Sequence, residues 1–562
     1  MTGEFRILTQ PKQIFSEFEK GNSFKASVGE LGIFEQTKLN ERFYVGDQWY
    51  GAKCGNNRPL ARRNIIKRIG EYKMSVVGAS PVSVRYTADG IPYNLKSKQR
   101  ADEVKAKLGE GRGISPQPDN DEIALITDSL SSYQKLCAER VKFDIKNEQL
   151  LRNAYISGTG IAYTYWDNEV DTGLFADKGK RQKIKGDIAF QVLDVENVIF
   201  GDPNSDDVQS QPYILLAERL DVGSVRREAK RNGLSTADIL PDGESRFNSG
   251  TRGESEPDDS RRVTVITKLF KEWDSEGEGY RVMAVKVTER AVVRKPWDIG
   301  LTMYPIAKFC WERRRTSAYG ESEITYLIPN QIAINRMLTA ECWSALAAGM
   351  PKLVVNGDIV GEDVKITNDP GQIIRANVGF EGSVANAMQY VSPSPWAEQY
   401  LAAVNDLSSN TMNDAGANDV ALGNVRPDNA AAIIQMREAA LQPLQIYQNR
   451  YYAFIEDIAR IWADFWINKY GNRFIKVEND EGVEYIPFNA ERYRNLVLNA
   501  KVDVGASTLW SEAVVVSTLD SLLSAGIITP SQYLERMPKG LIPKAAELAD
   551  ELGSAENTLT IG

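Results

Sequence analysis

Apolar positions follow two different periods along the chain, and the change of period divides it into regions. Ile65, Ile66 and Ile69 fall on one face of a helical segment, and helical spacing returns at 123–155 after a polar break at 109–121. Later segments alternate and are rich in β-branched and aromatic residues, which predicts strands at 160–167, 189–200, 262–274 and 280–293. A mixed α+β body, mainly helical, is therefore expected. The nearly apolar-free stretch at about 241–262 predicts a mobile insertion.

Two helices with a small insert between them are expected in the middle of the chain. The first spans 320–350, with Ser322 as its predicted N-cap. Its apolar stripe consists of residues four apart, namely Ile334, Leu338, Cys342 and Leu346. Turn signals separate short strand-like runs at 351–393, which predicts a small α/β insert. The second helix spans 394–409 and should break into a loop at 410–427, where Asn, Asp and Gly accumulate.

A long helix with a bend is predicted at 428–470. Pro443 lies well inside it, where proline removes a backbone donor and clashes with the preceding turn, so a kink is expected near 439–443. One apolar face continues beyond the proline through Tyr447, Tyr451, Phe454, Ile458, Trp462 and Phe465. That spacing favours a core or subunit-interface face over a base-stacking platform. A hairpin around Asp480–Gly482 and short terminal helices, one starting at Thr529 and Pro530, should follow.

Composition excludes several classes of protein. The 562 residues are 42% hydrophobic and 25% charged, which is ordinary for a folded chain. No stretch of 18 or more apolar residues exists and the N-terminus lacks a secretory pattern, so we expect cytosolic synthesis and no membrane partner. The chain has no histidine and no phosphate-binding loop, which removes the commonest general base and argues against an NTPase. Its cysteines, Cys54, Cys137, Cys310 and Cys342, are far apart and predict buried thiols rather than a zinc site.

One acidic motif leaves a metal-dependent reading open. Asp202, Asn204 and Asp206 alternate as in a calcium loop, but Asp207 stands where glycine is needed and Tyr213 where glutamate is needed. A plain Asx/Pro turn is the simpler interpretation. The alternative function is a carboxylate-dependent metal nuclease or hydrolase that uses Asp202, Asp206 and Asp207.

The charge pattern bears on nucleic-acid contact. A net charge of −9 opposes tight binding over a broad surface. The basic stretch with Arg62, Arg63, Lys67 and Arg68 contains interleaved isoleucines and predicts an amphipathic helix with an ordinary basic face. The segment 394–427 contains four acidic residues and a single basic one, Arg426. The acidic residues are Glu398, Asp406, Asp414 and Asp419. These charges fit either a solvated helix face or a lining that repels phosphate.

The order of these regions and several local sequence motifs resemble those of the portal proteins of tailed bacteriophages. The motifs are "FYVGDQW", "YISGTGIAYTYWD", "VLDVENVIFGDPNSDD", "YGESEITYLIPNQIAINRM" and "LLSAGIITPSQYLERMP". The resemblance covers essentially the full chain. It implies a non-enzymatic ring of about twelve subunits at one capsid vertex, without metal or other cofactor.

The resemblance also implies a division of the chain. It assigns 1–319 and 471–505 to the wing, 320–350 and 394–409 to two stem helices, 351–393 to the clip, 410–427 to the tunnel loop, 428–470 to the long kinked helix and 506–562 to a helical crown. The implied DNA-channel residues are Glu398, Asp406, Asn410, Asp414, Asn418, Asp419, Asn424 and Arg426. Arg426 could contact phosphate transiently, or it could pair with a nearby carboxylate.

The implied partners are other copies of the chain, viral double-stranded DNA, the terminase motor, a head–tail adaptor, the major capsid protein and a scaffold protein. The implied location is the virion, after assembly in the host cytoplasm. Another ring-forming head–tail adaptor remains an alternative to the portal.

Overall fold

The computed structural model divides the chain into two compact units. The larger unit comprises Met1–Phe34, Lys73–Ser322 and Val425–Gly562, and the smaller comprises Glu35–Tyr72 and Glu323–Asn424. The structure describes residues 9–49, 60–78, 83–88, 118–175, 183–242, 261–274, 279–349, 352–356, 358–360, 377, 388–391, 397–417, 441–479, 482–494, 496, 498–503, 516 and 519–537. Most of the predicted mobile insertion at 241–262 lies outside them. The fold is mixed helix and sheet, as the sequence predicts.

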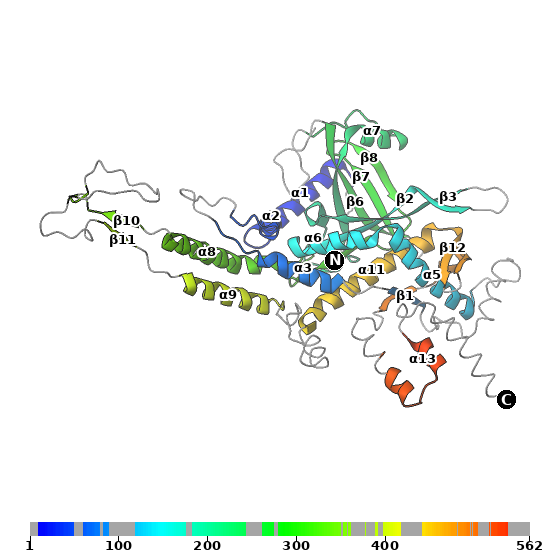
Figure 1. The fold of residues 1–562 in the computed structure, drawn as a ribbon. Coiled ribbons are helices and arrows are strands. Elements are labelled where there is room, and N and C mark those ends of the chain that lie inside the picture. The colour runs from blue at the N-terminus through cyan, green and yellow to red at the C-terminus, as the bar shows by residue number, and fades with distance from the viewer. Residues whose placement is uncertain are drawn as a thin grey trace. The chain divides into compact units, whose positions relative to one another are not determined.

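The larger unit contains a five-stranded antiparallel sheet. Its strands, in spatial order, are β4 (Val198–Phe200), β5 (Tyr213–Asp221), β6 (Arg262–Asp274), β7 (Gly279–Val287) and β8 (Val292–Asp298). Helix α1 (Pro11–Ser27) packs Ile14, Phe15 and Phe18 on one face, and α7 (Val222–Arg231) packs Val225 among side chains of the other (Figure 1). Both faces are covered because both carry apolar residues.

Two predicted strands are divided in the structure. The segment 280–293 turns between β7 and β8, where the Thr288 hydroxyl accepts a hydrogen bond from the Ala291 N–H at 3.1 Å. The segment 189–200 ends strand β3 (Lys183–Leu193), passes through a 3-10 turn at Val195–Asn197 and enters β4. The turn carries the chain from one sheet to another, so a single strand over 189–200 was wrong.

The second sheet has the order β3, β2, β9. Strand β2 (Thr159–Phe175) lies between β3 and β9 (Ile306–Cys310), antiparallel to both. The predicted strand at 160–167 is confirmed and is longer than expected. A smaller ladder pairs β1 (Ser83–Ala88) with β14 (Leu498–Asp503).

Helix α11 (Gln445–Lys469) supplies the main aromatic core of the larger unit. Tyr451, Phe454, Ile458, Trp462 and Phe465 are all buried, so the stripe packs inside the subunit. Rings from α5 (Asn120–Arg140), α6 (Phe143–Ser157), β3 and β9 contact it through Tyr133, Phe143, Phe190 and Phe309. Pro443 lies in a 3-10 turn at Gln442–Leu444 that directly precedes α11, which agrees with a break at this proline. The rest of the predicted helix, 428–440, lies outside the described residues.

A buried polar cluster joins α5, β3 and the end of α11. The Asp187 carboxylate pairs with Arg140, accepts a hydrogen bond from the Tyr470 hydroxyl at 2.6 Å and accepts another from the Ile188 N–H at 2.7 Å. The Tyr133 and Tyr470 hydroxyl oxygens are 3.1 Å apart. The carboxylate is therefore compensated by a charge and by directional donors.

Near the C-terminus two local predictions are confirmed. Strands β12 (Asn472–Asn479) and β13 (Gly482–Asn489) form the predicted hairpin. Helix α13 (Pro530–Arg536) starts where expected, with Thr529 and Gln532 forming a reciprocal capping box.

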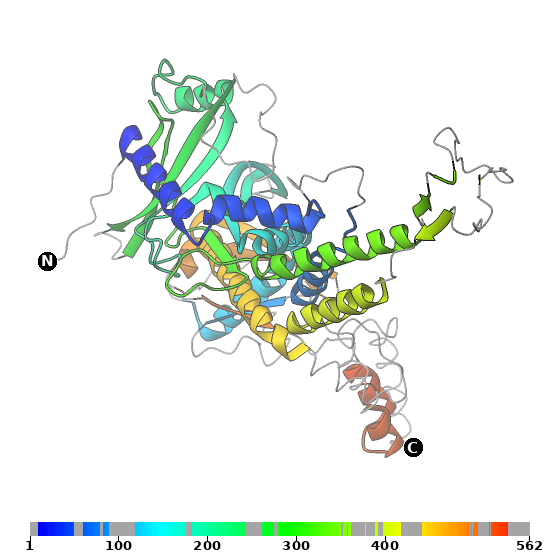
Figure 2. The same cartoon turned by 90° about the vertical axis from the view of Figure 1, so that its left-hand side faces the viewer.

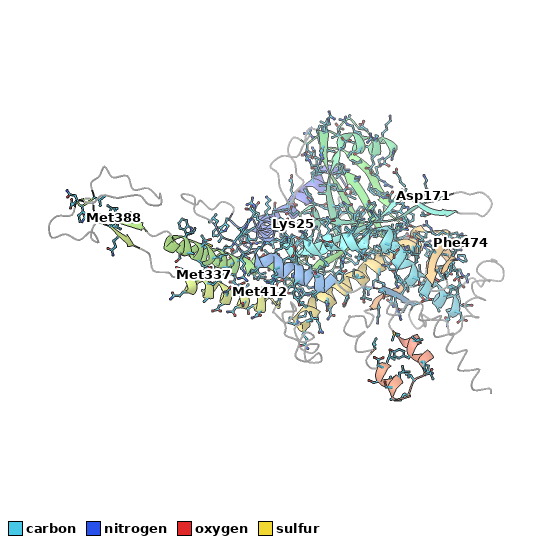
Figure 3. The ribbon with its side chains drawn as sticks, in the orientation of Figure 1. Lys25, Asp171, Met337, Met388, Met412 and Phe474 are labelled. Carbon is cyan, nitrogen blue, oxygen red and sulfur yellow. The ribbon has the colours of Figure 1, made fainter. Side chains whose placement is uncertain are left out.

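The thiols and the Lys25 side chain illustrate the packing. Cys137 and Cys310 are buried and Cys342 is half-buried; Cys54 lies outside the described residues. Lys25, labelled in Figure 3, is buried and donates hydrogen bonds to the carbonyl oxygens of Val195 and Glu196 at 2.6 and 2.9 Å. Burial lowers the pKa of Lys25 to about 7, while the nearby Glu196 opposes that shift.

The smaller unit is built on a helix pair. It contains α8 (Ile324–Gly349), α9 (Ala397–Asp414), most of α2 (Gly32–Val45) and the first half of α3 (Ile65–Gly78). Strands β10 (Lys352–Val355) and β11 (Met388–Val391) pair antiparallel beyond the C-terminal end of α8 (Figures 1 and 2). The rest of the predicted α/β insert lies almost wholly outside the described residues.

Helix α8 starts later than predicted. It begins at Ile324, and the Ser322 hydroxyl donates to the Tyr155 carbonyl oxygen at 2.6 Å. Ser322 therefore lies one residue before the position that directly precedes the helix, so the predicted start was too early. Burial along the predicted stripe also falls, from the fully buried Ile334 to Leu346, which is 45% exposed.

Candidate functional site

Helices α8 and α9 lie side by side and run antiparallel (Figure 2). Ile334 and Val404 are buried between them, with Met337, Leu338 and Leu407 packed around these two. The Asn330 side chain donates to the Thr411 hydroxyl at 3.1 Å. Met337 and Met412, labelled in Figure 3, mark the two helices. The contact fixes which face of α9 is buried and which is left to solvent.

Two buried amides fasten the start of α3 to α8. Gln331 accepts a hydrogen bond from the Ile65 N–H at 3.0 Å and donates to the Arg63 carbonyl oxygen at 2.7 Å. Asn335 accepts from the Arg63 N–H at 3.1 Å and donates to Gln48 at 2.6 Å. The first N–H groups of a helix lack acceptors within that helix, and here side chains of α8 accept their hydrogen bonds. The sequence analysis missed both amides, because buried Gln and Asn carry no local signal.

The exposed face of α9 is acidic or neutral. Asp406, Asn410 and Asp414 are all exposed on it, and the helix contains no lysine or arginine. The Arg63 guanidinium, which donates to the Asn405 side-chain oxygen at 3.1 Å, lies beside this face. The residues of α9 themselves therefore offer phosphate no positive charge.

The loop predicted at 410–427 begins too early, because α9 continues through Asp414. Met412 and Ala415 remain buried, so the apolar face persists for one more turn. The helix stops at Gly416, whose φ of +74° suits glycine, and the Ala417 N–H reaches back to the Met412 carbonyl oxygen at 2.8 Å. Asn410 and Asp414 are therefore helical residues. The sequence "DAGA" at 414–417 contains the glycine that ends the helix. The prediction placed the end earlier because it gave more weight to the accumulated Asn and Asp residues.

Asn418, Asp419, Asn424 and Arg426 lie outside the described residues. Glu398 belongs to α9 by its backbone, and its side chain is not among those described. Pro443 lies in the larger unit, at the turn before α11.

The acidic motif at 202–207 folds as a set of turns and ion pairs. The Asp202 carboxylate accepts a hydrogen bond from the Asn204 N–H at 3.0 Å, and that of Asp207 accepts from the Gln209 N–H at 2.9 Å. Asp206 pairs with Lys308 at 2.8 Å. Within the described residues, no group of three or more acidic or cysteine side chains is placed to hold a metal ion. These partners support the Asx-turn interpretation over a metal-dependent nuclease.

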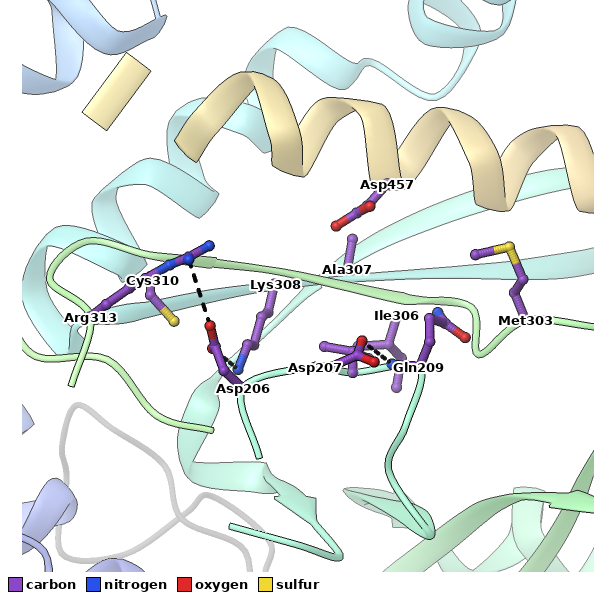
Figure 4. Close-up of a pocket in the computed structure, with 11 residues that line it drawn as sticks. Asp206, Asp207, Gln209, Met303, Ile306, Ala307, Lys308, Cys310, Arg313 and Asp457 are labelled. Carbon is purple, nitrogen blue, oxygen red and sulfur yellow. Dashed lines mark hydrogen bonds and ion pairs between the residues drawn. The ribbon is translucent and has the colours of Figure 1, made fainter. Parts of the chain in front are cut away.

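A pocket of about 350 Å³ lies beside this turn (Figure 4). Asp206, Asp207 and Gln209 line it from the turn, Ile306, Ala307, Lys308 and Cys310 from β9, Arg313 from the segment after β9 and Asp457 from α11. Asp457 points toward the pocket from α11. Burial raises the pKa of Asp457, Arg460 opposes the shift, and the negative charges of Glu456 and Asp207 add to it.

Comparison with models of known protein families gives a match. The model of the phage P22-like portal protein family matches residues 208–509, which is more than half of the chain. That range contains β5 to β9, the α8–α9 pair and α11. A search of the curated proteins found no match. None of the helices in the described part of the chain is both long and apolar enough to cross a bilayer.

Proposed function

This chain belongs to the phage P22-like portal protein family, and we propose that it forms the ring-shaped channel at one capsid vertex through which viral double-stranded DNA is packaged and ejected. Membership makes it a bacteriophage portal protein, a capsid component of genome packaging. Proteins of this family are generally structural, so the proposed role needs no chemistry. The observation that carries the proposal is the family match over residues 208–509.

The helix pair supports a specific arrangement within that role. In this proposal α8 and α9 form the stem, 351–393 the clip, 1–319 and 471–505 the wing, and 506–562 the crown. The tunnel loop then starts after Gly416 and ends at 427. The ring docks the terminase motor, the adaptor, the major capsid protein and scaffold, and it assembles in the host cytoplasm.

The exposed face of α9 is the proposed channel lining. A ring repeats Asp406 and Asp414 around the axis, and this acidic surface repels phosphate over about 8 Å at physiological salt. DNA that meets no deep electrostatic well can slide, whereas tight readout would retain it.

Ring assembly is the first expected result. The purified chain, imaged by negative stain and weighed in solution at several concentrations, should give rings with an open centre. For about twelve copies of the 62.6 kDa chain the mass is about 750 kDa. A compact dimer at every concentration would contradict the proposal, as would metal-dependent DNA cleavage lost in Asp206→Asn.

Reversing the α9 charges should convert a non-binding channel into a binding one. Assembled rings of Asp406→Lys/Asp414→Lys should retain a duplex of about 30 base pairs at least tenfold more tightly than the unmodified ring at 50 mM salt, and should release it as salt rises. The measurement is an electrophoretic shift assay across a salt series. Glu139→Lys/Glu148→Lys, which changes exposed acids on α5 and α6 by the same total charge, is the matched control. Equal gains in DNA affinity in both double variants would show that the exposed face of α9 does not line the channel.

A further inference from the structure

Lys25 is a fully buried lysine without a carboxylate in direct contact. It belongs to the last turn of α1, and its side chain is 0% exposed (Figure 3). Lysine is almost never buried to this extent unless an acid pairs with it. Among the residues that the structure describes, however, its ammonium forms no ion pair, and its hydrogen bonds go to backbone oxygens. The burial of Lys25 therefore has a cost that no direct counter-charge offsets.

Lys268 shows the usual arrangement on the same helix. It is also 0% exposed and comes from β6, and its ammonium pairs with the Glu17 carboxylate of α1 at 2.7 Å. The attraction of that carboxylate offsets part of the cost of burying the ammonium. Lys25 and Lys268 thus both fasten α1 to the larger unit, but only Lys268 has a neutralising partner.

The acceptors of Lys25 fit an uncharged amine. Its nitrogen donates to the carbonyl oxygens of Val195 and Glu196 at 2.6 and 2.9 Å, in the 3-10 turn between β3 and β4. A neutral amine has two N–H groups, whereas an ammonium has three. The rings of Phe34 and Tyr319, with centroids 5.9 and 5.4 Å from the nitrogen, give the ammonium cation–π contacts in place of a third acceptor. The site holds both forms, and its low polarity favours the uncharged one.

The charged groups nearby do not cancel this effect. Burial lowers the pKa of Lys25 to about 7, and the charge of the buried Glu196 opposes the shift without reversing it. Burial raises the pKa of Tyr319 above its ordinary value, so this ring stays uncharged. The Arg314 guanidinium, beside the connection that follows α1, is paired with Glu321 at 3.1 Å. Lys25 consequently changes its charge near neutral pH.

The chain turns sharply directly after this contact. Gly29 and Gly32 have φ angles of +73° and +74°, which suit glycine. A Cβ on Gly32 would lie 2.5 Å from the Ala26 carbonyl oxygen, so the corner between α1 and α2 is tight. Phe34, whose ring lies beside the Lys25 nitrogen, is the last residue of the larger unit before α2 continues into the smaller one. Release of Lys25 would free the end of α1 and this corner together.

We propose that Lys25 is a pH-sensitive contact: proton uptake releases it from the turn at Val195–Asn197, so the end of α1 opens more often as the pH falls. The inference goes beyond the proposed function, because it concerns one folded subunit. When α1 opens, water surrounds Lys25 and restores its ordinary pKa of about 10.4. Opening therefore takes up a proton between about pH 7 and about pH 10.4. The opening equilibrium rises as the pH falls through this range and levels off below about pH 7.

Residue-resolved hydrogen exchange on the full chain tests this, with each rate corrected for the intrinsic effect of pH on amide exchange. The N–H groups in the last turn of α1 should open at least fivefold more often at about pH 6.5 than at about pH 8.5. The chain contains no histidine, so the residue that usually changes charge in this range does not contribute. Equal opening at the two pH values overturns the inference.

Replacing the amine separates its charge from its packing. Lys25→Met keeps a long unbranched side chain that cannot take up a proton, so the opening of α1 should become independent of pH. Lys20→Met, at an exposed position on the same helix, should keep the full dependence of the unmodified chain. Thermal unfolding of both variants checks that each folds. Lys25→Met with the pH dependence of the unmodified chain contradicts the inference.

A second variant leaves Lys25 in place. Glu196→Gln removes the negative charge that opposes the effect of burial, so the pKa of Lys25 should fall further. Opening of α1 should then continue to rise below the pH at which that of the unmodified chain levels off. A merely structural role of Glu196 would change how often α1 opens without moving that pH, and such a result counts against the titration of Lys25.

Discussion

Replacing Asp187 by alanine should lower the free energy of unfolding of the larger unit by about 3–5 kcal/mol. The variant leaves the Arg140 guanidinium without its buried counter-charge and takes the acceptor from the Tyr470 hydroxyl. Asp187 is 1% exposed, so water does not replace the acceptor that the Tyr470 hydroxyl loses, whereas the Arg140 side chain is 31% exposed and stays partly solvated. Burial raises the pKa of Tyr470 well above its ordinary value, which keeps its hydroxyl protonated and in need of an acceptor.

Denaturant unfolding followed by tryptophan fluorescence gives the measurement. Asp238→Ala, at an exposed aspartate of the same unit, should change stability by less than about 0.5 kcal/mol. The double variant Asp187→Leu/Arg140→Met should lose much less than Asp187→Ala, because it leaves no unpaired charge. A loss below about 1 kcal/mol in Asp187→Ala would mean that water or a rearranged neighbour compensates Arg140.

Truncating Trp462 to alanine is the second large effect, with an expected loss of about 3–5 kcal/mol. The side chain is completely buried, and its ring lies 6.4 Å, centroid to centroid, from both Phe143 and Phe190. Its indole N–H donates to the Thr164 hydroxyl at 3.3 Å. The variant removes this packing and leaves a cavity where α6, β3 and α11 meet.

The comparison with an exposed tryptophan isolates burial as the cause. Trp273 is 57% exposed at the end of β6, and Trp273→Ala should change the unfolding free energy by less than about 1 kcal/mol. Trp462→Phe should fall between the two, since it keeps part of the buried ring. If Trp462→Ala and Trp273→Ala had equal effects, the aromatic stripe of α11 would not be the core of this unit.

The aromatic stripe shows what local pattern can predict. Helical spacing from Tyr451 to Phe465 was sufficient to predict a buried face, because a helix with one apolar side must cover that side. Proline at 443 similarly predicted a kink near 439–443, where the structure has a 3-10 turn at Gln442–Leu444, and Thr529 with Pro530 predicted a helix start. Each of these signals acts within a few residues of its own position.

Other features depended on contacts between distant parts of the chain. Ser322 was predicted to cap a helix that in fact begins at Ile324, and its hydroxyl donates to the distant Tyr155 carbonyl oxygen. The segment 189–200 was predicted as one strand, but a 3-10 turn divides it between two sheets. The buried amides Gln331 and Asn335 and the ion pair of Asp187 with Arg140 join segments far apart in sequence. Neither helical nor strand periodicity indicates which distant residues will form such contacts.

By itself the sequence determined the α+β class, most helices and strands, an apolar aromatic face on α11 and the resemblance to portal proteins, because propensity and periodicity are local and the order of the regions can be read along the chain. The tertiary structure decided where α9 ends, which face of it meets solvent, that the aromatic face of α11 packs inside the larger unit and that 189–200 divides between two sheets. These depend on packing partners and ladder register, and both are set only when segments far apart in sequence come together.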